Sequence, residues 1–133
     1  MSPAPGKEPD DPRTRREADI RLRLLFGGDA RLGPGKADLL ELIRETGSIS
    51  AAGRRMGMSY KRAWTLVETL NNIFCEPLVL STRGGPSGGG ASLTETGERV
   101  LAHYRQLEER ARAAGAADIA ALEGLLRDMS IKK

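Results

Sequence analysis

Apolar residues recur at spacings of three and four between Gly47 and Phe74, which is the period of amphipathic helices. Two stripes result, one of Ile49, Ala52 and Met56 and one of Ala63, Trp64, Val67, Leu70 and Phe74. Gly57 lies between them, where the chain must turn. Ser48 or Ser50 can cap the first helix and Ser59 the second, because a serine hydroxyl accepts a hydrogen bond from an orphan backbone N–H. The pattern predicts two helices joined by a tight turn, a helix-turn-helix.

The segment before this motif changes from period two to a helical period. Apolar and polar residues alternate over 20–26, which predicts a half-buried strand. Gly27-Gly28-Asp29 is a turn signal, and Leu32 either begins a short return strand or closes the loop. Pro34 suits a first helical turn, so a helix is predicted from there to Thr46. Its apolar face comprises Leu39, Leu40, Leu42 and Ile43, and its acidic residues Asp38, Glu41 and Glu45 are expected to face water.

A glycine-rich stretch follows the second helix of the motif. Pro77 blocks continuation of that helix, and residues 78–82 (LVLST) are predicted to form a strand. Residues 83–91 (RGGPSGGGA) contain five glycines, and residues 91–93 can return as the partner strand. Two strands around a flexible, basic-edged loop predict a wing, in which glycine allows close approach to a phosphate or minor groove. The alternative is a simple flexible loop.

The C-terminal part of the chain carries two further apolar stripes. Thr94 is predicted to cap a long helix, and Gly115 to break it before a final helix. One small domain can hardly cover both stripes, so we expect these helices to pair with the same helices of a second copy. The alternative is that the last helix folds back onto its own domain. The residues predicted for dimerisation are Val100, Leu101, Tyr104, Leu107, Ala111, Leu122, Leu125 and Leu126, and Ile119 and Met129 lie on the last stripe.

Length and composition are those of one domain with a tail. Residues 1–17 of the 133 are rich in proline and charge, which predicts disorder. Residues 18–93 form the predicted helix-turn-helix domain and residues 94–133 the dimerisation helices. Three arginines of the tail, Arg13, Arg15 and Arg16, could touch DNA, although an inert solubilising tail is favoured because nearby acids cancel the charge. No apolar run spans a bilayer and no signal sequence begins the chain, so a cytoplasmic protein is expected.

Charge favours a nucleic-acid partner for the helix-turn-helix. The net charge is only +3, but residues 48–66 hold four basic residues and no acidic one. We predict that the second helix enters the major groove, with Lys61 and Arg62 reaching guanine edges or nearby phosphates. Ser59 and Tyr60 are predicted phosphate contacts. The alternative is a solvated helix hairpin that has only a structural role in an ordinary helical core. Further predicted contacts are Thr65 on the second helix and Arg54 and Arg55, which flank the DNA backbone.

Several residues suggest other chemistry but favour simpler roles. Trp64 is expected in the core rather than stacked on a base. His103 has no cluster of metal ligands around it. The single cysteine, Cys75, excludes an internal disulfide and is expected to act as a small apolar residue. Glu108, with Glu109 and neighbouring arginines, is predicted to form a solvated helix face. No nucleophile–base or carboxylate pair stands out, so no enzyme is expected.

Two segments together resemble a known family. GSISAAGRRMGMSYKRAW, followed by RGGPSGGGASLTETGERVL, resembles the N-terminal DNA-binding domain of ModE-type molybdate-responsive transcription regulators. The first half alone is also similar to the winged helix of LysR-type regulators, which lack this wing and the Tyr-Lys-x-Ala-Trp segment. The resemblance covers about residues 20–112. It implies a mainly α winged helix-turn-helix with a small β wing, a long C-terminal dimerisation helix and a palindromic operator.

The resemblance also bears on site residues and cofactors. It places Ser59 to Thr65 on the recognition helix and Arg83, Gly84 and Gly85 on the wing. Full-length members carry C-terminal molybdate-binding domains, for which a chain ending at Lys133 leaves no room. No cofactor is therefore expected, and sensing of molybdate or tungstate is in doubt. The expected partners are double-stranded DNA and a second copy, with a full-length ModE-type relative as an alternative, and no membrane.

Two functions other than DNA binding remain open at this point. The first is that of a protein-interaction or adaptor module, since a winged helix also serves in that way, and the second is that of a small oxyanion-binding protein. Salt-dependent binding to duplex DNA separates a DNA-binding regulator from an interaction module, because the affinity of a protein that neutralises phosphates falls steeply with salt concentration.

Overall fold

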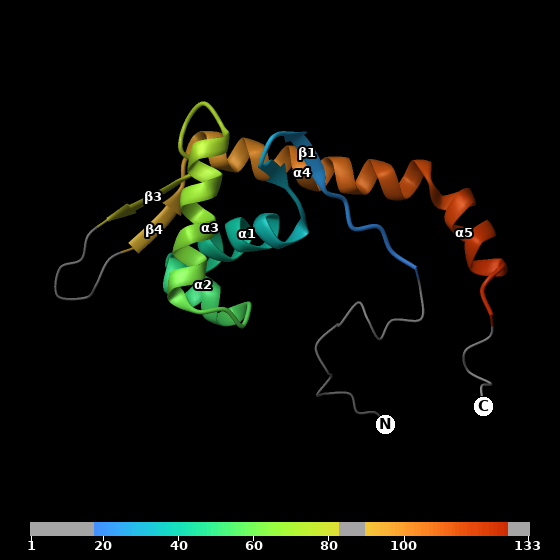
Figure 1. The fold of residues 1–133 in the computed structure, drawn as a ribbon, viewed down its shortest axis with the longest axis horizontal. Helices are drawn as coiled ribbons and strands as arrows, with labels where there is room; N and C mark the ends of the chain where they lie inside the picture. The colour runs from blue at the N-terminus through green and yellow to red at the C-terminus, as the bar shows by residue number, and fades with distance from the viewer. Residues whose placement is uncertain (1–17, 83–89, 128–133) are drawn as a thin grey trace, which may run out of the picture. The chain divides into compact units, whose positions relative to one another are not determined.

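The computed structural model describes residues 18–82 and 90–127. Helices dominate, and the described strands pair as two antiparallel hairpins (Figure 1). In chain order the elements are β1 (Leu24–Gly27), β2 (Ala30–Leu32), α1 (Pro34–Thr46), α2 (Ile49–Arg55), α3 (Tyr60–Ile73), β3 (Val79–Thr82), β4 (Gly90–Leu93), α4 (Glu95–Ala114) and α5 (Ala116–Gly124). The predicted tail, the wing residues Arg83, Gly84 and Gly85, and Met129 lie outside the described residues.

The described residues separate into two compact units. One comprises residues 21–108, and the other combines residues 18–20 with residues 109–127. The predicted boundary after residue 93, between a DNA-binding domain and dimerisation helices, stays a prediction. The first half of α4 belongs to the larger unit because Leu101 and Tyr104 are buried in its core, each only 2% exposed.

The helix-turn-helix has the predicted caps and turns. Ser48 Oγ accepts from the Ala51 N–H at 3.0 Å, and Ser59 Oγ accepts from the Arg62 N–H at 3.1 Å. Each bond satisfies one of the donors that a helix start leaves open. Gly57 has φ of 74° in the turn, a conformation that side chains with a Cβ rarely adopt. The two serines and this glycine confirm the predicted arrangement.

Close packing holds α2 and α3 together. A Cβ on Gly53 would lie 2.9 Å from the Cβ of Ala63, so a small residue is needed on each side of the crossing. Both residues are buried beside apolar side chains of α1. The helices α1, α2 and α3 form the predicted three-helix core. Its fully buried side chains include Leu39, Leu40, Ile43, Val67 and Leu70.

The first hairpin is shorter than predicted. The strand begins at Leu24, not Ile20, and pairs with a return strand that begins at Ala30 and ends at Leu32, so the predicted start at Leu32 is two residues late. The pairing extends no further because Gly33 becomes the N-cap of α1 immediately after Leu32. Residues 20–23 are consequently left without a strand partner. The helix α1 itself has the predicted bounds, Pro34 to Thr46.

The second hairpin, predicted as a wing, is attached to both neighbouring helices. Asn71 of α3 accepts from the N–H groups of Leu78 and Val79 at 2.8 and 3.0 Å, and donates to the Val79 carbonyl at 3.1 Å. On the other strand, the Ala91 N–H donates to the Gly47 carbonyl at 2.9 Å. The hairpin is therefore fixed on both sides of the helix-turn-helix, and the winged helix-turn-helix fold is confirmed.

The start of α4 packs against the wing. Thr94 caps the helix as predicted, accepting from the Gly97 N–H at 2.9 Å and donating to the Pro77 carbonyl at 2.8 Å. The Thr94 N–H also donates to the Leu78 carbonyl at 2.9 Å. Gly97 lies directly over Leu78, where no side chain fits. The wing and α4 are thus joined through backbone contacts.

An ion cluster joins α1 to α4 and corrects a prediction. The Arg105 guanidinium reaches Asp38 at 2.8 Å, Glu41 at 2.7 Å and Glu108 at 3.1 Å. Burial lowers the pKa of Arg105, but its hydrogen bonds to these carboxylates outweigh that effect and raise the pKa above its ordinary value. Asp38 and Glu41 are therefore paired rather than simply solvated, and Glu108, which pairs within its own helix at i,i+3, is buried rather than on a solvated face. The period of each helix could not indicate the pairs with Asp38 and Glu41, because these residues are 67 and 64 positions from Arg105.

The predicted dimerisation residues fall into two groups. Leu101 and Tyr104 are buried in their own chain, and the Tyr104 hydroxyl donates to the Leu22 carbonyl at 2.6 Å. Their assignment to a dimer interface is corrected, because they have no surface left to offer. The leucines at the end of α5 and directly after it are by contrast exposed: Leu122 by 63%, Leu125 by 81% and Leu126 by 70%. Val100 and Ala111 are partly buried, and Leu107 is 37% exposed.

Candidate nucleic-acid interface

The second helix of the motif, α3, has one buried and one exposed face. Ala63, Val67 and Leu70 are buried against the core. The first turn contains no acidic residue, and its helix dipole adds positive charge there. The side chains predicted to contact DNA from this helix are all exposed: Ser59, Tyr60, Lys61, Arg62 and Thr65. The predicted face is therefore free, although its contact with DNA stays a prediction.

Tyr60 and Trp64 support each other on this face. The Trp64 indole N–H donates to the Tyr60 hydroxyl, and the two rings meet edge to face at 6.3 Å. Trp64 is half-buried and packs against the core. The prediction of a core tryptophan is confirmed in part, since its indole nitrogen reaches the exposed face. Tyr60 is thereby held at the N-terminal end of α3.

Hydrogen bonding limits what Thr65 can do. Its hydroxyl donates to the Lys61 carbonyl at 3.0 Å, one helical turn earlier. A hydroxyl has only one hydrogen, so Thr65 can then act toward a ligand only as an acceptor. Phosphate oxygens need donors, whereas the amino groups of adenine and cytosine need acceptors. Thr65 is thus suited to a base edge rather than to the backbone.

Two further predicted contacts lie at the end of α2. Arg54 and Arg55 occupy its last turn and are exposed. Arg54 Nη1 donates to Ser50 Oγ at 3.1 Å, which orients its guanidinium along the helix surface. Both charges suit the negative end of the α2 dipole. They add positive charge beside the α2–α3 turn.

Arg62 faces a basic pocket that the sequence analysis missed. The pocket has a volume of about 370 Å³ and is also lined by Arg23, Arg31 and Lys36. Burial, with the charges of Arg31 and Arg23, lowers the pKa of Lys36. These residues show no common period, because they come from β2, α1, α3 and the segment before β1. Only the fold brings them together.

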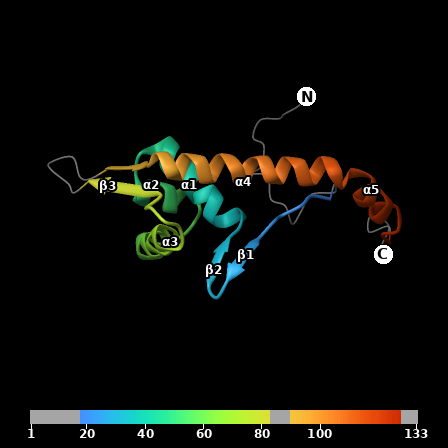
Figure 2. The same cartoon turned by 90° about the horizontal axis from the view of Figure 1, so that it is seen from above.

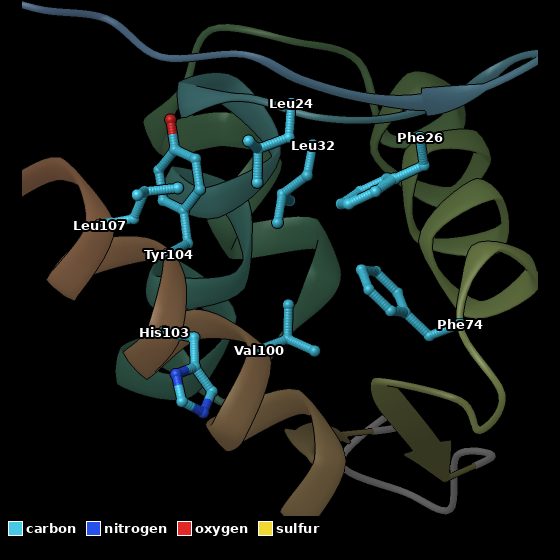
Figure 3. A pocket seen from close by; sticks show the side chains of 8 residues that line it. All are labelled: Leu24, Phe26, Leu32, Phe74, Val100, His103, Tyr104 and Leu107. Carbon is cyan, nitrogen blue, oxygen red and sulfur yellow. The ribbon is translucent and has the colours of Figure 1, made fainter. Parts of the chain in front are cut away.

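An apolar pocket lies elsewhere in the same unit. It has a volume of about 270 Å³ and is lined by residues of β1, β2, α3 and α4 (Figure 3). Phe26 and Phe74 meet edge to face at 6.0 Å on one side of it, and His103 lies at its border (Figure 3). Among residues 18–82 and 90–127, no group of three or more His, Cys, Asp or Glu could hold a metal.

The predicted role of Cys75 is wrong. Cys75 is exposed, so it does not pack as a small apolar residue at the end of α3. The reason is that α3 ends at Ile73 with Phe74 as its C-cap, so Cys75 lies in the exposed bend between the helix and Pro77. No helix within the described ranges has the length and apolar character required to cross a bilayer.

Comparison with known proteins agrees with this geometry. Residues 36–98 match the model of the bacterial regulatory helix-turn-helix proteins of the LysR family. These residues are thus similar to the helix-turn-helix domain of that family. The match begins in the first turn of α1 and ends in the first turn of α4, so it includes the whole motif and wing region.

Relatives of this helix-turn-helix domain carry names that connect them with molybdenum. The molybdenum-pterin-binding protein MopB of Rhodobacter capsulatus is 48% identical over 79 residues, which are 59% of this chain and 29% of MopB. The molybdenum transport protein ModE of Azotobacter vinelandii is 41% identical over 105 residues, 71% of this chain and 39% of ModE. The DNA-binding transcriptional dual regulator ModE of Escherichia coli K12 is 36% identical over 93 residues, which are 70% of this chain and 36% of that ModE. The chain thus spans roughly a third of these relatives' length.

Proposed function

We propose that this protein is a sequence-specific DNA-binding transcription regulator of the ModE type. The observation that carries the proposal is the exposed, acid-free first half of α3, held by the helix-turn-helix beside an attached wing. Relatives named as ModE transcriptional regulators support it. The function is one of binding, not of catalysis. A regulator of this kind acts where DNA is, so we also propose a cytoplasmic location.

In the proposed complex, the N-terminal turns of α3 enter the major groove. Lys61 reaches base edges or nearby phosphates, Ser59 and Tyr60 contact phosphates, and Thr65 accepts from a base amino group. Arg54 and Arg55 lie along the backbone. The wing residues Arg83, Gly84 and Gly85 lie along an adjacent phosphate strand or minor groove.

Removing a base-reading side chain should weaken operator binding. Lys61→Ala is expected to cost about 1–3 kcal/mol of binding free energy, with lower discrimination between sequences. Arg62→Ala should also weaken binding. Footprinting on the protein's own upstream DNA, with and without molybdate, locates the site, and titration then measures the affinity.

Arg110→Ala is the matched control, because it removes one exposed positive charge from α4. It should bind as the wild type does. If Lys61→Ala and Arg62→Ala also bind as the wild type does, α3 is not the recognition helix. If the wild type protects no DNA, the interaction-module alternative replaces this proposal. Protection that requires molybdate would point instead to an oxyanion-responsive regulator.

We further propose that the protein acts as a homodimer on a palindromic operator. The exposed leucines at the end of α5 and directly after it support this, because three large apolar side chains within five residues are otherwise left in water. A second copy, or a full-length ModE-type relative, would cover them. Two-fold dimers suit paired half-sites.

Analytical ultracentrifugation at micromolar concentration tests the dimer. The wild type should sediment as a dimer, and Leu122→Asp with Leu126→Asp should give a monomer, because burying two carboxylates in an apolar interface is costly. Leu80→Asp changes an equally exposed leucine on β3 and should leave the dimer intact. A monomeric wild type would exclude the homodimer.

A further inference from the structure

A pocket lined by cations lies between the first hairpin, the start of α1 and the recognition helix. Arg23 precedes β1, Arg31 lies in β2, Lys36 lies in the first turn of α1 and Arg62 in the first turn of α3. Its volume is about 370 Å³ and no acidic residue lines it. Four positive charges, three from different elements and one from the segment before β1, therefore converge on one space.

These charges have no carboxylate partners within the described part of the chain. Elsewhere in the same unit, Arg44 and Arg105 form ion pairs at 3.0 Å or less. No ion pair is formed by Arg23, Arg31, Lys36 or Arg62 among the described residues. Like charges brought together without a counter-charge repel each other. An anion in the pocket would remove that repulsion.

Several hydrogen-bond donors line this pocket. The Lys36 ammonium donates to the Arg31 carbonyl at 3.0 Å, which fixes it at the pocket and leaves its other hydrogens available. The lowered pKa of Lys36, caused first by burial and then by Arg31 and Arg23, agrees with this crowding. The N-cap of α1 is Gly33, whose lack of a side chain leaves the first N–H groups of the helix uncapped. Three guanidinium groups, an ammonium and a helix start together match the oxygens of a phosphate.

The pocket also borders the proposed DNA-binding face. In both views α3 lies between the wing strands and the first hairpin (Figures 1 and 2). The pocket includes Arg62 and Leu66 on the side of α3 that faces α1 and β2. A duplex lying along α3 would thus present one backbone strand to the wing and another to this pocket.

We propose that this pocket is a phosphate-binding site, formed by Arg23, Arg31, Lys36 and Arg62. Where the phosphate belongs to DNA, the inference rests on the proposed function and names the second backbone contact of the complex. The same chemistry would also accept free inorganic phosphate. Binding to DNA phosphates is measured with a duplex and binding to free phosphate with inorganic phosphate alone, so the experiment can distinguish the two sources.

The test uses the full chain with Arg31→Gln and Lys36→Gln combined. Arg31 is exposed and Lys36 half-exposed, and neither belongs to the predicted base-reading set. Arg110→Gln with Arg127→Gln removes two exposed positive charges elsewhere and serves as the control. Circular dichroism and chemical unfolding establish that each variant is folded. If the double variant does not fold, Arg31→Gln alone is used.

Two measurements are made on each protein. Duplex binding over a range of salt concentrations should show the pocket variant about tenfold weaker, with a salt slope smaller by about one, because one phosphate contact is lost. The control should keep the slope of the wild type. Thermal unfolding in inorganic phosphate, against chloride at equal ionic strength, should raise the melting temperature of the wild type but not of the pocket variant if free phosphate binds.

Each outcome decides the question. A change in the salt slope without a phosphate-dependent shift assigns the site to the DNA backbone. A phosphate-dependent shift that the pocket variant loses establishes the site for free phosphate, even if the wild type binds no DNA and the proposed function fails. If the wild type binds DNA and the pocket variant matches it in both measurements, the phosphate site is wrong while the proposed function stands. If the wild type neither binds DNA nor responds to phosphate, both are wrong.

Discussion

Replacing Gly97 by alanine is expected to lower the free energy of unfolding by about 3 kcal/mol, which is severe for a domain of this size. The new Cβ would collide with the carbonyl oxygen of Leu78, a backbone atom that cannot rotate away. Leu78 is fully buried. Its neighbours are fixed by Thr94 on one side and Asn71 on the other. The helix would have to move off the wing, and this cost exceeds the roughly 1 kcal/mol that alanine gains in helix propensity.

Gly35→Ala is the matched control for this substitution. Gly35 also lies in the first turn of a helix, but a Cβ there meets nothing within 4 Å. Urea unfolding should show it equal to the wild type or up to about 1 kcal/mol more stable. A Gly97→Ala variant as stable as the control would mean that α4 does not rest on Leu78 in solution.

The parts of the fold that depend on neighbouring residues could be predicted from the sequence. The helix α1 has the predicted bounds because Pro34 and Gly47 mark its ends by their own backbone preferences. The caps Ser48 and Ser59 lie within three residues of the N–H groups that they bind. The wing strands follow from Pro77 and from the apolar residues on either side of the glycine run. These signals are local, so no knowledge of the tertiary structure is needed to use them.

The parts that depend on distant residues could not be predicted. An apolar stripe indicates that a helix face is covered but not what covers it. For this reason Leu101 and Tyr104 were assigned to a partner, although they pack in their own core. The candidate site shows the same limit. The exposed face of α3 follows from its period, whereas the pocket around Arg62 requires the hairpin and α1 to be placed beside it.

Replacing Arg105 by methionine is expected to cost about 3 kcal/mol of unfolding free energy, because one guanidinium neutralises three carboxylates. The Glu108 side chain is only 9% exposed, so the variant leaves its charge with little water and no partner. Without the guanidinium, the carboxylates of Asp38, Glu41 and Glu108 would also repel one another. Methionine keeps much of the side-chain length, so the loss reports on charge more than on packing.

A second substitution separates this explanation from a simple loss of packing, because it removes one of the carboxylate charges without restoring the arginine side chain. Adding Glu108→Gln to the variant should recover part of the loss at neutral pH, since it removes the buried charge.

Arg44→Met provides the contrast. Arg44 pairs with Glu98 at 3.0 Å, but both side chains are 46% exposed. Water solvates each charge when the other is removed, so the cost in urea unfolding should stay within about 1 kcal/mol. An Arg105→Met loss as small as that of Arg44→Met would mean that water already solvates the carboxylates around Arg105. In that case the apolar residues alone would hold α4 against α1.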